Sequence, residues 1–223
     1  MWAIKIISKL SFLHAISSFI VSSIPYVILH NFSKYHELRK ALKIIDMDKI
    51  DGCYCEFGCF TGAALKHVIK LTSKSKFLST KKTYGFDSFK GFPEEVHSEF
   101  KSENFVSNYD DVKKLEKKTN GRCKIVKGYF DESLKSLELN NEIKNISLAF
   151  IDCDLAVSSQ PVFEFIKNKL VHGSFIVIDE YYFIDKNGGS IRKEFLKKFE
   201  MNKNVFLFST YGLGGAVFKY YTD

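Results

Sequence analysis

The chain has 223 residues, and its 33 basic and 26 acidic side chains give it a net charge of +7 at pH 7. Hydrophobic residues make up 45% of it and charged residues 26%, which excludes collagen-like, disordered and multi-span membrane proteins. The length suits one domain of α/β size. The basic excess favours anionic partners such as nucleotides, lipid headgroups or anionic glycans. Because no nucleic-acid-binding motif accompanies it, we expect no nucleic acid as a partner.

The N-terminal segment is apolar and uncharged. No formal charge occurs over residues 10–33, and apolar residues recur there at helical spacing, which predicts a helix with one apolar face. Pro25 and repeated serines argue against a membrane-spanning helix. Three alternatives remain open for residues 1–33: packing on protein, including a second copy in a homo-oligomer; peripheral attachment to a membrane; or a signal or anchor segment.

The elements after this segment alternate between helix and strand. Helices are expected over residues 34–45, 62–71, 160–170 and 190–199. Strands are expected over residues 53–59, 83–87, 123–127, 147–152, 174–179, 204–208 and 216–219. This order predicts an α/β fold with a doubly wound, mostly parallel seven-stranded sheet and a C-terminal antiparallel hairpin. Residues 1–50 then form a helical extension, and residues 51–223 form the main domain.

The five cysteines indicate a reducing compartment. Cys53, Cys55 and Cys59 cluster, but their spacing is not that of a structural zinc site. Buried, reduced thiols on a strand are the better interpretation. We therefore expect a cytoplasmic protein, with membrane association through residues 1–33 as the open alternative.

A glycine-bearing motif follows the first predicted strand, as Glu56-Phe-Gly58-Cys-Phe-Thr-Gly62. Glycines let the backbone pass close to a ligand, and the helix that follows offers its amino end. Asp87 ends the next strand, where an acidic residue typically accepts hydrogen bonds from ribose hydroxyls. Together these residues indicate a nucleoside site, whereas a plain tight turn would explain the glycine motif alone.

Carboxylates gather at the ends of two later strands. Asp152 and Asp154 flank Cys153, so alternation would place both on one side, and Asp179-Glu180 ends the next strand. Neighbouring parallel strands would bring the four carboxylates into one crevice, where their repulsion calls for a cation. Hard oxygen ligands favour Mg²⁺ or Mn²⁺. The alternative is that these residues are only helix caps and turn acids.

Several motifs occur in a fixed order over about residues 52–199. They are Glu56-Phe-Gly58-x-Phe-x-Gly62, Gly85-Phe-Asp87-Ser-Phe89-x-Gly91-x-Pro93, Lys127-Gly-Tyr-Phe130, Phe150-Ile-Asp152-Cys-Asp154-Leu, Ile178-Asp179-Glu180-Tyr181 and Gly189-Ser-Ile-Arg192-Lys-Glu-Phe195. In these motifs the sequence resembles the macrocin O-methyltransferase (TylF-type) family of metal-dependent sugar O-methyltransferases. The Gly-Phe-Asp-Ser-Phe block is the most specific of them.

The resemblance implies a class I, Rossmann-like fold that binds S-adenosylmethionine in residues 51–223. The cofactor-binding residues that it implies are Glu56, Gly58 and Gly62 at the methionine end, Asp87 at the ribose with Ser88 beside it, and Tyr129, Phe130 and Asp131 near the adenine.

The resemblance also implies a catalytic and metal-binding group. Asp152, Asp179 and Glu180 would bind Mg²⁺, and Asp154 would be the general base beside Asp152. The family usually has a second Asp where Glu180 stands and an aromatic residue where Ala156 stands. The alternative bases are His97 and His172, for which structural or solvent-facing roles are favoured.

The implied acceptor is a sugar hydroxyl, in the biosynthesis of a surface polysaccharide or another glycoconjugate. Two alternatives remain open. One is methylation of a non-sugar small molecule such as a catechol. The other is a non-catalytic module that binds S-adenosylmethionine and docks a membrane or assembly partner through residues 1–33.

Overall fold

The computed structural model describes residues 11–93, 102–184 and 188–222. Its centre is a seven-stranded sheet with the order β3-β2-β1-β4-β5-β7-β6. The strands are β1 (Cys53–Phe57), β2 (Thr83–Asp87), β3 (Cys123–Lys127), β4 (Ile146–Ile151), β5 (Leu170–Ile178), β6 (Val205–Tyr211) and β7 (Gly215–Tyr220). Strands β1 to β5 pair in parallel, and β7 runs antiparallel to both β5 and β6. The predicted fold class is therefore confirmed.

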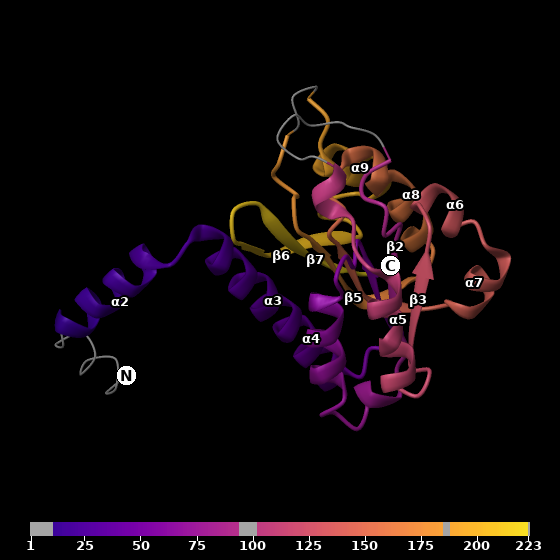
Figure 1. Cartoon of the computed structure of the whole chain (residues 1–223), viewed down its shortest axis with the longest axis horizontal. Helices are drawn as coiled ribbons and strands as arrows, with labels where there is room; N and C mark the ends of the chain where they lie inside the picture. Colours follow the sequence, from indigo (N-terminus) through magenta and orange to yellow (C-terminus); the bar gives the residue numbers. More distant parts are fainter. Residues whose placement is uncertain (1–10, 94–101, 185–187, 223) are drawn as a thin grey trace.

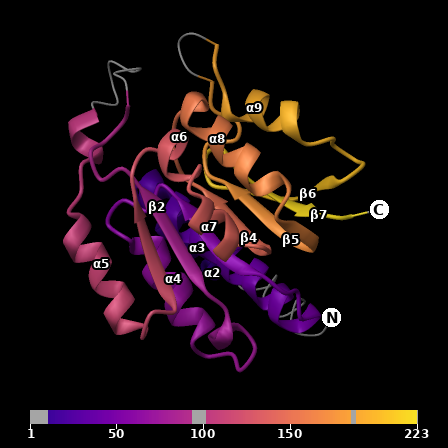
Figure 2. The ribbon, with the colours of Figure 1, turned by 90° about the vertical axis from the view of Figure 1, so that its right-hand side faces the viewer.

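Helices cover both faces of this sheet (Figure 1). They are α2 (Ser11–Ser23), α3 (Tyr26–Asp48), α4 (Ala63–Thr72), α5 (Tyr109–Lys118), α6 (Phe130–Ser133), α7 (Leu137–Glu142), α8 (Ala156–Lys167) and α9 (Ile191–Lys198), with short 3-10 turns at Leu78–Thr80 and Ser102–Phe105. One cluster of buried side chains packs α3, α4 and α5 on one face, and a second packs α7, α8 and α9 on the other. Figure 2 shows the two layers on opposite sides of the strands. Every residue of the central strand β4 is buried, as expected for a strand covered on both faces.

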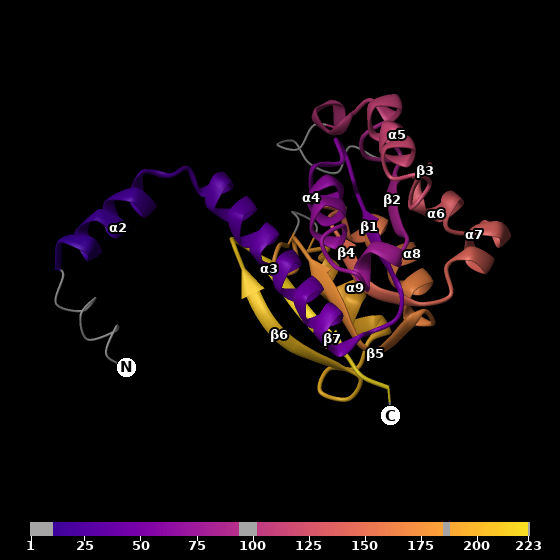
Figure 3. The same cartoon turned by 90° about the horizontal axis from the view of Figure 1, so that it is seen from below.

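Helix α3 belongs to the core of the domain. It begins at Tyr26, earlier than the predicted start near Lys34, because within residues 11–48 the helical backbone is broken only around Pro25. Leu38, Ala41 and Ile45 are at most 1% exposed. The helix lies beside β5 and β6 (Figure 3).

Helix α2 instead extends away from the domain (Figure 1). Its apolar side chains are open to solvent, with Phe19 71% and Val21 56% exposed. The apolar face of α2 therefore does not pack on its own domain. Within the described ranges, no single helix has the length and apolar composition of a membrane span. Helices α2 and α3 pass that test only as a pair, which is bent by 106°.

All five cysteines are free and buried, as predicted. The Sγ atoms of Cys53 and Cys55 lie 3.6 Å apart on β1. These thiols are part of the packed interior of the sheet.

Candidate active site

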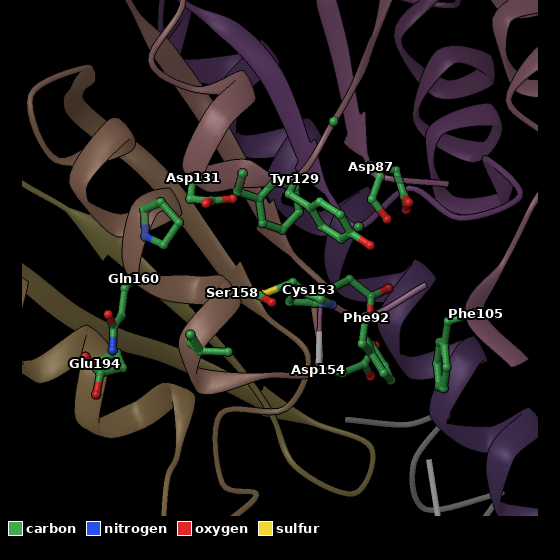
Figure 4. Close-up of a pocket in the computed structure, with 18 of the residues that line it drawn as sticks. Asp87, Phe92, Phe105, Tyr129, Asp131, Cys153, Asp154, Ser158, Gln160 and Glu194 are labelled. Atoms are coloured by element: carbon green, nitrogen blue, oxygen red, sulfur yellow. The ribbon is translucent and has the colours of Figure 1, made fainter. Parts of the chain in front are cut away.

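A cavity of about 770 Å³ opens at the carboxyl ends of β1 to β4 (Figure 4). Open α/β sheets bind their ligands at this edge, and a volume of several hundred Å³ is typical of small-molecule sites. Eight of the predicted site residues line the cavity: Gly58, Asp87, Ser88, Tyr129, Phe130, Asp131, Asp152 and Asp154. Glu56, Gly62, Asp179 and Glu180 are not among the lining residues.

Gly58 lets the ends of two strands touch. Its φ is +94°, and a Cβ atom there would overlap the backbone carbonyl of Asp152. Only glycine fits such an approach in this backbone conformation. Gly62 has φ +71° and directly precedes α4, so it serves the turn rather than the cavity wall.

Asp87 is fixed by backbone donors. The N–H groups of Phe60 and Phe89 each donate to its carboxylate at 2.7 Å. Burial raises the pKa of Asp87. Ser88 shapes the loop that follows, because its hydroxyl donates to the carbonyl of Gly91 at 2.9 Å and accepts from the N–H of Lys90 at 3.1 Å. The Asp87 carboxylate is therefore held at the cavity wall, where sugar hydroxyls can donate to it.

Glu56 is only 1% exposed and lies behind the wall. The hydroxyl of Tyr54 donates to its Oε2 at 2.6 Å. Burial outweighs this bond and raises the pKa of Glu56 to about 8. A cation placed nearby would favour the ionised form of this carboxyl.

The segment after β3 forms another wall. Tyr129 directly precedes α6, and Asp131 is an exposed residue in the first turn of that helix. Phe130 packs edge-on against Phe57 in the core, with ring centroids 6.1 Å apart. Figure 4 shows Tyr129 between Asp131 and Asp87, so these three residues bound one end of the cavity.

Three carboxylates converge beside this cavity. Asp152, Asp154 and Glu180 each offer an oxygen, and these oxygens lie within 4.8 Å of one another. Asp154 has φ +59°, a left-handed conformation that is uncommon for a residue with a side chain and is found at functional sites. Burial and the neighbouring Asp179 raise the pKa of all three carboxyls, and that of Asp154 to about 6.

One atom of this cluster lacks a partner. The buried Oε2 of Glu180 accepts no hydrogen bond from any of the described residues. A buried oxygen without a donor is costly, and three hard oxygen ligands at this spacing suit Mg²⁺ or Mn²⁺. The residues present therefore fit a divalent cation.

Asp179 stands outside this group of three, because donors from other parts of the chain surround it. Nζ of Lys34 lies 2.8 Å from its Oδ2, the hydroxyl of Tyr211 donates to its Oδ1 at 2.7 Å, and Nε2 of His30 lies 3.1 Å from both oxygens. Burial acts to raise the pKa of Asp179, but the His30 hydrogen bond and the Lys34 charge outweigh it and hold the pKa well below its usual range. The structure therefore groups Asp152 and Glu180 with Asp154. The resemblance instead implies Asp179 as their third partner.

Lys34 connects Asp179 to the cluster, since its Nζ also lies 3.1 Å from Oδ2 of Asp152. Burial acts to lower its pKa, but the two carboxylates outweigh burial and raise the pKa above its usual value, so the ammonium stays charged. His30, Lys34 and Tyr211 were not predicted from the sequence. His30 and Lys34 are four residues apart and so share a helix face, but nothing local shows what that face covers.

Two further aromatic residues were also missed. Phe92 and Phe105 line the cavity with ring centroids 4.3 Å apart, and Figure 4 shows them near Asp154. Of the alternative bases, His172 is exposed and its Nδ1 lies 3.3 Å from the hydroxyl of Thr222, while His97 lies outside the described residues.

Comparison with known proteins gives the family and the fold of the chain. Residues 31–208 match the sequence profile of the family described as Macrocin-O-methyltransferase (TylF). A search of curated proteins gives no match.

Several solved structures share the fold. The calicheamicin methyltransferase CalS11 superimposes with a TM-score of 0.71 at 20% identity, over 91% of this chain and 85% of that one. The apo structure of CalS11, described as a TDP-rhamnose 3′-O-methyltransferase in calicheamicin biosynthesis, gives 0.64 at 18% identity over 91% and 86%. The O-methyltransferase NovP gives 0.66 at 14% identity over 85% and 80%. At these identities the likeness concerns the fold.

The family profile covers well over half of the chain and includes both the cavity and the acidic cluster. The chain therefore belongs to the macrocin O-methyltransferase family and is an O-methyltransferase.

Proposed function

We propose that the protein transfers the methyl group of S-adenosylmethionine to a sugar hydroxyl with the help of Mg²⁺ or Mn²⁺, in the biosynthesis of a surface glycan or glycoconjugate. The observation that carries this proposal is the convergence of Asp152, Asp154 and Glu180 beside a cavity whose other wall holds Asp87. The description of CalS11 as a TDP-rhamnose methyltransferase supports a sugar as the acceptor class.

The cofactor occupies the half of the cavity formed by β1 to β3. Asp87 accepts from the ribose hydroxyls, and Tyr129, Phe130 and Asp131 bound the adenine. The ammonium of the methionine end lies towards Glu56, a carboxyl whose pKa is raised by burial. This placement directs the sulfonium methyl to the carboxylates.

We assign the divalent cation to Asp152 and Glu180, because both offer oxygens to the same point and Oε2 of Glu180 has no donor among the described residues. The cation supplies positive charge that makes an acceptor hydroxyl more acidic. Asp179, the third ligand implied by the resemblance, instead binds Lys34, His30 and Tyr211.

Asp154 acts as the general base. Its pKa of about 6 leaves it ionised at neutral pH and still able to take a proton. The acceptor oxygen attacks the methyl carbon in line, the new C–O bond forms as the C–S bond breaks, and the electron pair stays on sulfur. Asp154 holds the hydroxyl proton, and the product is neutral S-adenosylhomocysteine. Phe92 and Phe105 bound the acceptor side and restrict water there.

The test is formation of S-adenosylhomocysteine with a panel of nucleotide-linked sugars, TDP-rhamnose among them, and with catechol. We expect transfer to a sugar, loss of transfer in excess EDTA, and recovery on addition of Mg²⁺. Full activity in excess EDTA would remove the metal from the proposal. Faster transfer to catechol than to any sugar would favour the small-molecule alternative.

We also propose that α2 attaches the enzyme to a membrane surface from the cytoplasmic side. The support is its exposed apolar side chains, the absence of charge over residues 10–33, the net charge of +7 and the five free thiols. Sedimentation with anionic vesicles should retain the wild type and lose Phe19→Ser. A homodimer in light scattering that does not bind vesicles would instead assign α2 to a subunit interface.

A further inference from the structure

The acidic cluster already holds a cation of the chain itself. We propose that Lys34 is a positioning residue whose ammonium takes the place of a bridging cation between Asp152 and Asp179 and keeps Asp179 from binding the divalent metal. This inference rests on the metal site of the proposed function, and it adds a residue from outside the sheet that determines which carboxylates bind the metal.

The contacts are those of a bridging cation. Nζ of Lys34 lies 3.1 Å from Oδ2 of Asp152 and 2.8 Å from Oδ2 of Asp179. The side chain of Lys34 is 11% exposed and that of Asp179 is 3% exposed, so solvent screens the interaction weakly. Nζ also lies 5.8 Å from the ring centroid of Phe150. An ammonium buried in this way stays charged because it is paired on two sides.

The helix holds Lys34 in this position. Leu38 and Ala41, about one and two turns further along α3, are at most 1% exposed and anchor it to the sheet. One turn earlier, Nδ1 of His30 accepts from the backbone N–H of Leu213 at 3.2 Å, which leaves Nε2 as the donor to Asp179. The backbone of α3 is therefore fixed on both sides of Lys34, and its two ion pairs hold the ammonium at Asp152 and Asp179.

In this arrangement Lys34 competes with the metal for the carboxylates of Asp152 and Asp179. Its charge repels a second cation beside Asp152, and its hydrogen bond occupies an oxygen of Asp179. The divalent metal is thus left with Asp152 and Glu180, next to Asp154. Removal of the ammonium would remove the repulsion and free Asp179 to become an additional ligand.

The measurement is Mn²⁺ binding to the full chain, followed by electron paramagnetic resonance and calorimetry, so that no methyl transfer is needed. We expect Lys34→Met to raise the association constant by at least about tenfold, as expected for removing a like charge next to the site. Lys34→Gln should act in the same direction and serves if Lys34→Met does not fold. If Lys34 served only to stabilise the fold, its replacement would lower the affinity for Mn²⁺ or leave it unchanged.

A second substitution locates the effect. Asp179→Asn should weaken Mn²⁺ binding more in the Lys34→Met background than in the wild type and should abolish the gain there, because only in that background does Asp179 reach the metal. Lys40→Met is the matched control, since Lys40 lies on the same helix and pairs at 2.7 Å with the buried Glu37, outside the acidic cluster. Its Mn²⁺ affinity should equal that of the wild type.

The outcomes separate this inference from the proposed function. Affinity that is unchanged or weaker in both folded Lys34 variants would overturn the inference. Equal weakening by Asp179→Asn in both backgrounds would overturn it too, because Asp179 would then already be a ligand. If Lys34→Met binds Mn²⁺ and the wild type does not, the inference stands and metal assistance in the proposed function fails.

Discussion

The two halves of the cavity are held together by different means. At the ends of β1 to β3, Asp87 is held by the backbone N–H groups of Phe60 and Phe89, which lie 27 and 2 residues away from it in the sequence. At the ends of β4 and β5, Asp152 and Asp179 are held by Lys34, which lies 118 and 145 residues away. The contacts of the first half lie among the loops that follow strands of the sheet, whereas those of the second join the sheet to α3.

This difference has a consequence for function. Backbone donors near the ends of sheet strands cannot change partners without disturbing the sheet. The half of the cavity that contains Asp87, called the cofactor half below, is therefore rigid. In the acidic half, side-chain ion pairs between α3 and the sheet hold Asp152 and Asp179, while Asp154 and Glu180 have no ion pair with any described residue. Substitutions that act on one half and spare the other test this division.

The largest effect is expected where the two halves touch. Gly58→Ala would place a methyl group on the carbonyl of Asp152 in a backbone conformation that disfavours alanine. We expect it to lower the free energy of unfolding by more than about 4 kcal/mol or to prevent folding. Gly121→Ala is the control, because Gly121 also has φ +75° but no atom within 4 Å of its Cβ position. Urea unfolding should show a loss of only about 1 kcal/mol there, and equal losses at both positions would contradict the close approach.

The next effect concerns the acidic half alone. Asp154→Asn removes the proposed base and should lower kcat by about 10³-fold, within the range typical of general bases. Assays at saturating Mn²⁺ separate this effect from metal binding. Affinity for S-adenosylmethionine should stay unchanged, because Asp87 lies in the other half. A kcat within tenfold of the wild type would assign the base elsewhere.

A smaller effect is expected in the cofactor half. Asp87→Asn keeps the size of the side chain but removes its charge, and should weaken S-adenosylmethionine binding by about 10- to 100-fold, as for loss of a charged hydrogen bond. Calorimetry measures this change. Mn²⁺ affinity should not move, and if both affinities fell together the two halves would not be independent.

A separate effect is a pH dependence at Glu56, behind the wall of the cofactor half. The pKa of Glu56 is about 8 in the folded protein against an ordinary 4.5, so between these values the folded state holds a proton that the unfolded state has lost. Rising pH therefore lowers stability through this window, by at most about 1.4 kcal/mol per pH unit, and has no such effect below pH 4.5.

Glu56→Gln removes this dependence. From pH 5 to pH 8, the stability of the variant should rise relative to that of the cofactor-free wild type in urea unfolding. Parallel stability profiles for the two proteins would show that the Glu56 carboxyl does not carry a raised pKa.

The same division explains what the sequence could predict. The strands Thr83–Asp87 and Cys123–Lys127 match their predicted bounds, because continuous β-type runs ending in turn residues are local signals. The convergence of Asp152, Asp154 and Glu180 followed from strand ends that meet at one edge of a parallel sheet.

The other features of the site depend on contacts between distant parts of the chain, which no local sequence pattern indicates. The part played by Lys34 rests on how α3 packs across the sheet, so its sequence neighbourhood looks like that of any helix lysine. For the same reason, the sequence could not show that Asp179, rather than Asp154, is neutralised from outside the cluster. The early start of α3 at Tyr26 was not predicted, because residues 10–33 form one uncharged, largely apolar run in the sequence.

The break at Pro25 also defines how much of the N-terminus can be removed. A protein shortened to begin there would lose α2 and the exposed Phe19, yet keep His30, Lys34 and the buried Leu38. One shortened to residue 51 would lose a layer of the core together with the counter-ion of Asp179. The segment whose removal would spare the core and the acidic cluster therefore ends near residue 25. This is about halfway along the predicted helical extension of residues 1–50.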